Sequence, residues 1–375
     1  MKIYLAQQNY HIGNFDANTE KIIEGINKAK AEGADLVLFS ELCICGYPPR
    51  DFLEFDDFIN QCYEAIGKVK VHADTIGVLI GGPARNPRKE GKELFNAAFF
   101  LYEGEVKAEI HKTLLPTYDV FDENRYFEPA FSWKCIEFKG RKLAVTICED
   151  IWNLGDNPLY RLTPMEVLIK ESPDVMLNLS ASPYNYAQDT VRNSIVKAHT
   201  EKYRIPMLYC NNVGSQTEIV FDGGSLVYDA AGNKVKELAY FEEDYFLYEA
   251  PLPTRSETAP SVSRGEPGTA QAQPKQEATI AVETSLRENN TAEQILQAEL
   301  PGDKKASTES GALQPGRSGQ EGRTYYYSAA DVGKGSDIIA YLTDDKNIGE
   351  IHRALLLGIR DYFFKMGFKK ATLGA

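Results

Sequence analysis

The amino-acid sequence predicts an α/β fold in which two β-sheets pack together and helices flank them. Two observations support this prediction. Apolar runs typical of buried strands alternate with amphipathic helical segments, and several neighbouring strands are joined by turns short enough for hairpins. The pattern covers residues 1–251, which is long enough for one large domain.

The first half of this region alternates strands and helices and then ends in a hairpin. A helix is expected where Ile22, Ile23 and Ile26 share one face, and Gly33 can end it. Glu103 and Gly104 form a turn between two apolar runs, which predicts the hairpin. The expected strands are 2–8, 34–40, 75–83, 96–102 and 105–112, and the expected helices are 18–33 and 55–71.

The second half repeats the same kinds of unit. A turn near Gly140 joins two expected strands, and the sequence Ala230 to Asn233 joins the last predicted hairpin. The segment 222–225, DGGS, is expected to be a turn. The expected strands are 133–138, 142–148, 174–180, 206–212, 225–229, 234–240 and 244–252, and the expected helices are 164–171 and 188–203.

Composition limits the class of protein. The chain has 375 residues, 43% of them hydrophobic, and a formal net charge of −13, which argues against a nucleic-acid partner and favours a small molecule. Residues 1–10 lack the apolar core of a signal peptide, and no stretch approaches the roughly 18 apolar residues of a membrane span. We therefore expect a cytoplasmic protein with no membrane partner. In that compartment its six cysteines would be free thiols.

The composition changes abruptly after the predicted domain. Residues 252–325 are rich in Pro, Gly, Ser, Gln and Glu, and we expect them to form a low-complexity flexible linker. Residues 347–366 carry an apolar stripe at helical spacing, and 368–375 are expected to form a strand. Because one helix and one strand cannot form a domain, we expect residues 326–375 to begin a second domain that is absent, which would leave the helix exposed or associated with another chain.

Three residues with complementary chemistry follow predicted strands. Glu41 comes after 34–40, Lys112 ends 105–112, and Cys148 ends 142–148. A thiolate can attack an amide carbon, a carboxylate can move the protons, and a cation with a backbone N–H can stabilise the oxyanion. This combination predicts amide hydrolysis through a thioester. Each residue alone also has an ordinary interpretation, as a core thiol, a solvated loop acid or an edge charge.

The sequences around the three residues decide between these interpretations. Glu41 lies in FSELCICGYPPRDFL, Lys112 in HKTLLPTYDVFDENRYF and Cys148 in AVTICEDIWN. Together they resemble the nitrilase, or carbon–nitrogen hydrolase, superfamily, and in particular the glutamine amidohydrolase domain of bacterial glutamine-dependent NAD+ synthetases. The resemblance implies a four-layer α-β-β-α sandwich.

The resemblance also implies a role for each residue. Glu41 would be general base and then acid, Lys112 the oxyanion stabiliser and Cys148 the nucleophile, while Glu123 would hold the charges of the site in place. The glutamine pocket would be lined by residues that match by position, with Glu149 and Ser182 facing the charged ends of the substrate. These pocket residues are Tyr47, Tyr118, Phe121, Glu149, Trp152 and Ser182.

One position departs from the family pattern. Some relatives carry a basic residue about six positions after the serine, where it faces the glutamine carboxylate. Here Gln188 stands nearest to that place, and Arg192 lies further along the chain. The carboxylate partner therefore stays open between these residues.

Other ligand motifs are weak or missing from the sequence. Cys43 and Cys45 form a C-x-C pair without a second pair at zinc spacing, so we expect no metal. Neither a dinucleotide fingerprint nor a P-loop motif is present, so we expect no cofactor in this chain. The resemblance implies ATP and Mg²⁺, with deamido-NAD+ as acceptor, only for the synthetase domain. It also implies assembly into a homo-oligomer or association with a synthetase domain.

Three functional hypotheses follow from the sequence. The first is the glutamine-hydrolysing part of a glutamine-dependent NAD+ synthetase, which releases ammonia for ATP-dependent amidation of deamido-NAD+. The second is a free-standing nitrilase-type amidase that acts on another small amide. The third is a non-catalytic subunit of a split synthetase, and the intact Glu41, Lys112 and Cys148 argue against it.

Overall fold

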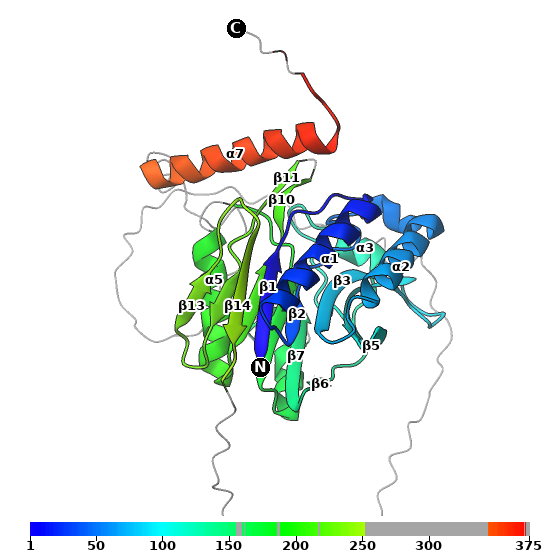
Figure 1. Ribbon diagram of the computed structural model, residues 1–375, viewed down its shortest axis with the longest axis vertical. Helices are drawn as coiled ribbons and strands as arrows, with labels where there is room; N and C mark the ends of the chain where they lie inside the picture. The colour runs from blue at the N-terminus through cyan, green and yellow to red at the C-terminus, as the bar shows by residue number, and fades with distance from the viewer. Residues whose placement is uncertain are drawn as a thin grey trace, which may run out of the picture. The chain divides into compact units, whose positions relative to one another are not determined.

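The computed structural model describes residues 1–154, 160, 162–185, 188–216, 218–251, 344–370 and 372. Two six-stranded sheets form the main body. Figure 1 shows this body and labels many of its strands. The predicted linker at 252–325 lies outside the described residues. None of the described helices combines the length and apolar character that crossing a membrane requires.

The first sheet has the strand order β14-β1-β2-β3-β4-β5. β1, β2 and β3 are parallel, and the outer strands pair antiparallel. Its strands are β1 (Lys2–Gln7), β2 (Leu36–Leu38), β3 (Gly77–Arg85), β4 (Leu94–Tyr102), β5 (Glu105–His111) and β14 (Asp244–Glu249).

The second sheet has the order β13-β12-β9-β8-β7-β6, again with three parallel strands, β7, β8 and β9. Its remaining pairs are antiparallel. Its strands are β6 (Ile136–Phe138), β7 (Arg141–Ile147), β8 (Val175–Ser180), β9 (Met207–Asn211), β12 (Leu226–Tyr228) and β13 (Lys234–Glu237).

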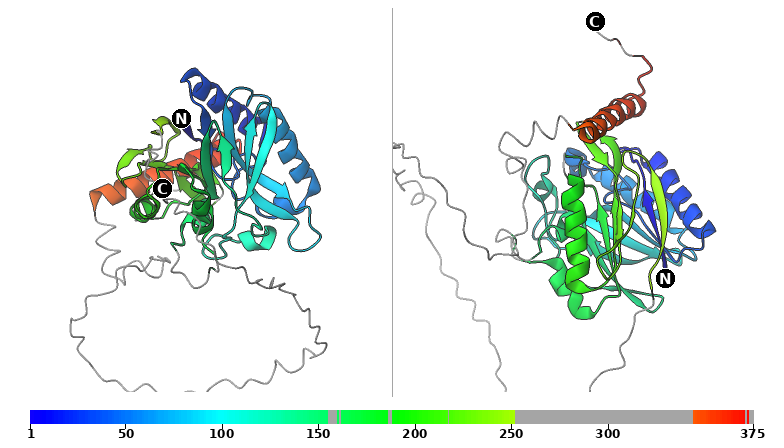
Figure 2. Two further views of the ribbon diagram at one scale, coloured as in Figure 1. Left: turned by 90° about the horizontal axis from the view of Figure 1, so that it is seen from below. Right: turned by 90° about the vertical axis from the view of Figure 1, so that its left-hand side faces the viewer.

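Alternating side chains place the sheets between two layers of helices. Leu5 and Leu38 of the first sheet share a core with Leu177 of the second, so these faces pack together. The outer face of the first sheet packs on α1 (Phe15–Ala31) and α2 (Asp56–Lys70), and that of the second on α4 (Pro164–Leu168) and α5 (Gln188–Tyr203). Figure 2 shows α1 and α5 on opposite sides, and the predicted four-layer α-β-β-α sandwich is confirmed.

Most predicted elements are present with shifted ends. α1 begins at Phe15, three residues before the prediction, because the side chain of Asn14 accepts a hydrogen bond from Ala17 N and caps the helix. The strand expected at 133–138 is only β6, and the helix expected at 164–171 continues from α4 into a 3₁₀ turn, Ile169–Glu171. Several elements were not predicted. They are the short helix α3 (Glu123–Tyr126), the hairpin of β10 (Val213–Gln216) and β11 (Ile219–Asp222), and the 3₁₀ turns Arg50–Glu54 and Cys148–Ile151.

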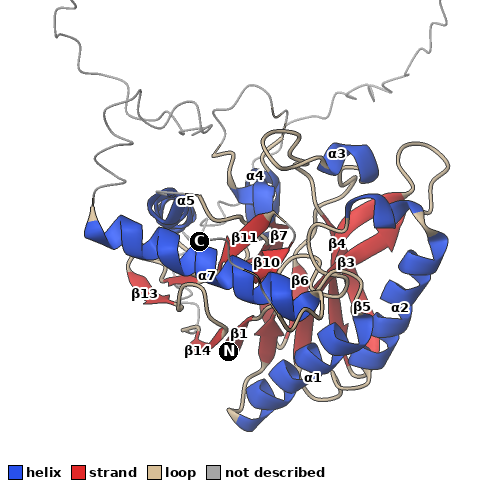
Figure 3. Ribbon diagram, turned by 90° about the horizontal axis from the view of Figure 1, so that it is seen from above, coloured by secondary structure: helices blue, strands red, loops and turns tan. Residues whose placement is uncertain are grey.

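The C-terminal helix, α7 (Asp345–Lys365), lies against the β10–β11 hairpin (Figure 3). Ala354 and Leu357 are buried against Val213 and Phe241. The sequence predicted an exposed helix, and for the face with Ala354 and Leu357 this prediction is wrong. Another face of the helix is exposed and carries Leu355, Ile359 and Tyr362, among others. Residues 368–370 form no strand, and most of the remaining predicted strand lies outside the described residues.

Candidate active site

The three predicted residues lie at one edge of the sandwich. Glu41 follows β2, Lys112 follows β5 and Cys148 follows β7. β5 runs in the same direction as β2, because each of the two antiparallel pairings from β3 through β4 to β5 reverses the chain. A hydrogen bond from Ala181 N, just after β8, to Glu41 Oε2 spans 2.9 Å and brings the matching edges of the two sheets together.

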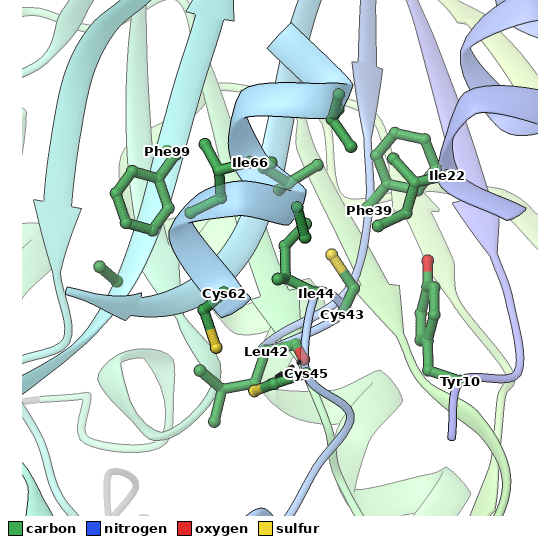
Figure 4. Close-up of a cluster of buried hydrophobic side chains, with 14 of the residues drawn as sticks. Tyr10, Ile22, Phe39, Leu42, Cys43, Ile44, Cys45, Cys62, Ile66 and Phe99 are labelled. Carbon is green, nitrogen blue, oxygen red and sulfur yellow. Dashed lines mark hydrogen bonds between the residues drawn. The ribbon is translucent and has the colours of Figure 1, made fainter. Parts of the chain in front are cut away.

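Gly81 lets the turn with Glu41 approach β3. A Cβ atom at this position would lie 2.3 Å from Leu42 N, so any larger residue would force the turn away. The turn packs into the core through Leu42, Cys43, Ile44 and Cys45, as Figure 4 shows. Cys43 Sγ lies 3.3 Å from Gly81 N, from which it accepts a hydrogen bond. These contacts fix the backbone that carries the Glu41 side chain.

Lys112 lies between two buried carboxylates. Its Nζ donates to Glu41 Oε1 over 2.8 Å and to Glu123 Oε1 over 2.7 Å. Burial lowers the pKa of Lys112, but the carboxylates of Glu123 and Glu41 outweigh it and hold this pKa well above its usual value. Lys112 is therefore a buried ammonium, and the structure brings it together with both predicted acids.

Asn96 and Tyr47 complete the hydrogen bonds of these acids. Asn96 Nδ2 donates to Glu41 Oε1 over 2.7 Å and to Glu123 Oε2 over 3.4 Å. The Tyr47 hydroxyl donates to Glu123 Oε1 over 2.8 Å. Sequence reasoning missed Asn96, which lies inside the apolar strand β4. Tyr47, expected in the pocket, holds Glu123 in place.

Cys148 begins a 3₁₀ turn, Cys148–Ile151, directly after β7. Its φ of 43° is a left-handed conformation that non-glycine residues rarely adopt, and such strain is common at functional positions. Burial raises the pKa of the Cys148 thiol well above its usual value, Glu41 raises it further, and Lys112 only partly offsets them. The resting sulfur is thus a thiol, and a base must remove its proton.

Asp150 ties this turn to the segment after Lys112. Its carboxylate accepts hydrogen bonds from Thr113 N at 2.9 Å, Leu114 N at 2.8 Å and Ile147 N at 3.1 Å. Burial raises the pKa of Asp150 to about 7, while the N–H groups of Leu114 and Ile147 oppose this shift. Asp150 therefore fixes the relative positions of Lys112 and Cys148, a role that the sequence did not reveal.

Glu149 is a second buried acid beside Cys148, held by two tyrosines. The hydroxyls of Tyr118 and Tyr160 donate to its two carboxylate oxygens over 2.9 Å and 2.8 Å. Burial raises the pKa of Glu149 to about 7, although both hydroxyls favour the charged form. Phe121 packs edge-on against Tyr118, with ring centroids 5.6 Å apart. The structure thus brings Tyr118, Phe121 and Glu149 together, and Tyr160 is an addition.

The other predicted pocket residues lie further along the chain. Ser182 is buried next to Ala181, which contacts Glu41. Trp152 packs against the core between the second sheet and its helices. Gln188 is the half-buried first residue of α5. Arg192 is fully buried and forms a bidentate pair with Asp222, over 2.9 and 2.7 Å, so its charge is already matched inside the protein.

The cluster has the groups that acyl transfer to a thiol requires, namely a nucleophile, a proton acceptor and a buried cation. Within the described ranges, no three His, Cys, Asp or Glu side chains are grouped so that they could hold a metal ion. All six cysteines are free thiols.

Two glutamine-dependent NAD(+) synthetases are similar to this chain over about two thirds of its length. A glutamine-dependent NAD(+) synthetase from Synechocystis sp. is 38% identical over 252 residues, which cover 65% of this chain and 45% of that protein. The same enzyme from Thermotoga maritima is 35% identical, over 67% of this chain and 42% of that protein. The chain therefore spans less than half the length of these relatives.

Solved structures show the same fold. The glutamine-dependent NAD+ synthetase from Acinetobacter baumannii, in complex with ADP, is 32% identical with a TM-score of 0.60, over 66% of this chain and 44% of that one. An amidase from Nesterenkonia sp. AN1 has a TM-score of 0.57 at 22% identity, over 67% of this chain and 93% of that one, and at this identity the likeness concerns the fold alone.

The model of the carbon-nitrogen hydrolase family matches residues 2–260. The match spans both sheets and the whole cluster around Glu41, Lys112 and Cys148. This chain therefore belongs to the carbon-nitrogen hydrolase family.

Proposed function

We propose that this chain hydrolyses the side-chain amide of glutamine to glutamate and ammonia. The observation that carries the proposal is the buried ammonium of Lys112, held between Glu41 and Glu123 within the electrostatic reach of the Cys148 thiol. The names of the relatives support glutamine as the amide donor. Glu149, a buried acid that two tyrosines hold, provides a partner for the α-ammonium group of the substrate.

The first half of the reaction forms a thioester. Glu41 takes the proton of the Cys148 thiol as sulfur attacks the amide carbon, because the raised thiol pKa leaves little thiolate at neutral pH. Lys112, together with the N–H of Glu149, stabilises the oxyanion of the tetrahedral intermediate. Glu41 then returns the proton to the amide nitrogen, the C–N bond breaks, and ammonia leaves.

The second half consumes water. Glu41 removes a proton from the water molecule that attacks the thioester carbon, and Lys112 again stabilises the oxyanion. The C–S bond then breaks, the sulfur recovers its proton from Glu41, and glutamate leaves. Glu123 and Asn96 keep the charges of Lys112 and Glu41 in place throughout, because both contact these side chains directly.

The fate of the released ammonia is the second part of the proposal. We propose that it serves the ATP-dependent amidation of deamido-NAD+ at a second domain, which would use Mg²⁺ and for which residues 326–375 form the beginning. The relatives, which are more than twice as long as the matched region, support this assignment. We also propose that the chain is cytoplasmic, because free thiols are stable in that compartment. It would act in a homo-oligomer or in association with a synthetase domain.

Ammonia release from glutamine tests the proposal. Wild-type protein should release ammonia and glutamate in equal amounts, and Cys148→Ala should abolish the reaction, whereas Cys62→Ala, which removes another buried thiol, should keep it. A panel of small amides distinguishes a glutaminase from a free-standing amidase. The proposal fails if C148A retains the wild-type rate, or if another amide is hydrolysed far faster than glutamine.

A further inference from the structure

Asn211, the last residue of β9, holds the backbone of Ser182 from both sides. Its Oδ1 accepts a hydrogen bond from Ser182 N over 2.8 Å, and its Nδ2 lies 3.3 Å from Ser182 O. The Asn211 side chain therefore binds both the backbone N–H and the backbone C=O of Ser182. Neither Asn211 nor Ser182 is exposed. This pairing, next to the isolated β-bridge between Pro183 and Phe221, fixes the position of the chain just after β8.

A buried ion pair keeps Asn211 itself in place. Its Nδ2 also donates to Gly223 O over 2.8 Å and lies 3.3 Å from Asp222 Oδ1. Arg192 contacts the same two partners, because Nη1 donates to Gly223 O and Nη2 to both oxygens of Asp222. The Asn211 amide is thus held on one side by the Arg192–Asp222 pair and holds Ser182 on the other.

The segment that Asn211 holds reaches Glu41 directly. Ala181, the neighbour of Ser182, donates its N–H to Glu41 Oε2 over 2.9 Å, and Glu41 N donates to Ser180 O over 3.4 Å. Lys112 and Asn96 both contact the other oxygen, Oε1. Among the hydrogen bonds of the described residues, Ala181 thus supplies the donor to Oε2. A shift of the 181–182 backbone would free this oxygen and let the carboxylate turn.

We propose that Asn211 is a positioning residue, which acts through Ser182 and Ala181 to aim the Glu41 carboxylate at Cys148. The inference rests on the proposed role of Glu41 as the base. It adds a residue that touches neither the substrate nor the reacting sulfur. It also gives the Arg192–Asp222 pair a function in the site, as the anchor of the Asn211 amide.

The rate at which iodoacetamide alkylates Cys148 tests this link without reference to any substrate. Mass spectrometry of the Cys148 peptide follows the reaction, and thermal unfolding checks that each variant is folded. Asn211→Ala should slow alkylation about tenfold, because a base that is misplaced by a fraction of an ångström loses much of its efficiency. The matched control is Asn178→Ala, since Asn178 is equally buried in the neighbouring strand β8 and its side chain forms hydrogen bonds with the side chains of Thr146 and Ser180.

A double-mutant cycle separates positioning from general loosening. In the Glu41→Gln background, N211A should slow alkylation less than about twofold, because the base through which Asn211 acts is already gone. Equal slowing in both backgrounds, no slowing by N211A, or equal slowing by N178A would overturn the proposal. If N211A does not fold, Asn211→Asp replaces it in the same cycle, since it preserves the side-chain volume and removes both N–H donors.

The glutamine assay keeps the two proposals apart. If the wild-type protein releases no ammonia from glutamine, the proposed function fails, while the alkylation cycle still measures the coupling between Asn211 and Glu41. If glutamine is hydrolysed and the cycle shows no coupling, the function stands and the positioning role fails. If the wild-type enzyme is active, N211A should lower its kcat about tenfold. The double variant E41Q/N211A should have the same kcat as E41Q alone.

Discussion

The ammonium nitrogen of Lys112 lies 2.8 Å from Oε1 of Glu41, and neither side chain has any exposed surface. Glu123 contacts the same ammonium over 2.7 Å. Two carboxylates thus share one cation in a buried site. Such a group is stable only while the cation is present, because a buried and unpaired charge costs several kcal/mol. Lys112 should therefore matter for stability as well as for the reaction.

We predict that Lys112→Met lowers the free energy of unfolding by about 3–5 kcal/mol at pH 7.5, as measured by urea denaturation. The loss should shrink toward pH 5, because burial raises the pKa of Glu123 and protonation then relieves the repulsion between the acids. Lys107→Met is the control, since Lys107 forms solvent-exposed ion pairs with Glu103 and Glu105 and its loss should lower the free energy of unfolding far less. Equal losses for the two variants would contradict the prediction.

The pKa of Glu149 predicts how glutamine binding depends on pH. Burial raises this pKa to about 7, so the acid is neutral below pH 7 and attracts the α-ammonium group less strongly. KM for glutamine should then rise about tenfold per pH unit as the pH falls below 7, and it should level off above 7. Glu149→Gln should give a high KM that does not change with pH. A wild-type KM that is constant between pH 5.5 and 8 would refute this assignment.

Tyr118 should set the position of that transition. Its hydroxyl donates to Glu149 over 2.9 Å and stabilises the charged carboxylate, so Tyr118→Phe should raise the pKa of Glu149 and move the rise in KM to higher pH. Tyr4→Phe is a matched control, because Tyr4 also donates to a glutamate, Glu32, which directly follows α1. The pH profile of KM should be unchanged in Y4F. A profile of Y118F that coincides with that of the wild type would contradict the prediction.

The sequence could predict the residues that stand at the ends of strands. Apolar runs end at Ser40, His111 and Ile147, and a charged or nucleophilic residue follows each of them. Strand direction then brings these residues toward one edge, but the sequences around them, through their resemblance to a known family, were needed to predict their roles.

The supporting residues could not be predicted in this way. Asn96 is one amide inside an apolar strand, and Asp150 follows another acid, so neither pattern reveals its partners. Their roles depend on contacts between segments distant in the chain, such as the bond from Asn96 to Glu41. The β10–β11 hairpin was missed because its sequence, VGSQTEIVFD, has a glycine and several polar residues and lacks a clear strand pattern.

Arg192 distinguishes a structural role from substrate binding. If it held the carboxylate of glutamine, Arg192→Met would mainly raise KM. The structure predicts instead that R192M lowers the free energy of unfolding by about 3–5 kcal/mol, because Asp222 is then a buried charge without its counter-ion. Urea denaturation measures this loss. The double variant R192M/D222N should recover a large part of it, since it removes both charges.

The control for Arg192 is Lys197→Met, which removes an exposed charge on the same helix, α5, and should cost less than about 1 kcal/mol. A stable R192M protein with a strongly raised KM would contradict the structural role. It would also favour Arg192 over Gln188 as the partner of the glutamine carboxylate.

The contact of α7 with the main body depends on two charged residues. Asp361 Oδ2 accepts hydrogen bonds from Asn9 Nδ2 over 2.6 Å and from Ser215 N over 2.8 Å. Lys365 Nζ donates to Asn9 Oδ1 and Tyr10 O, each over 2.7 Å, and to Ser215 O over 2.8 Å. Each of these two side chains therefore connects α7 both to the segment that follows β1, at Asn9, and to β10, at Ser215.

We predict that Asp361→Ala releases α7 from the body. Without the carboxylate, Lys365 keeps only neutral acceptors in a largely buried place, and a lost hydrogen bond to a charged group costs about 1.5–3 kcal/mol. Amide hydrogen exchange in residues 345–365 should become at least about tenfold faster, while exchange in β7 and β8 stays unchanged. Lys346→Ala, at an exposed position of the same helix, should leave exchange at its wild-type rate. Unchanged protection in D361A would show that the apolar contacts of Ala354 and Leu357 hold α7 by themselves.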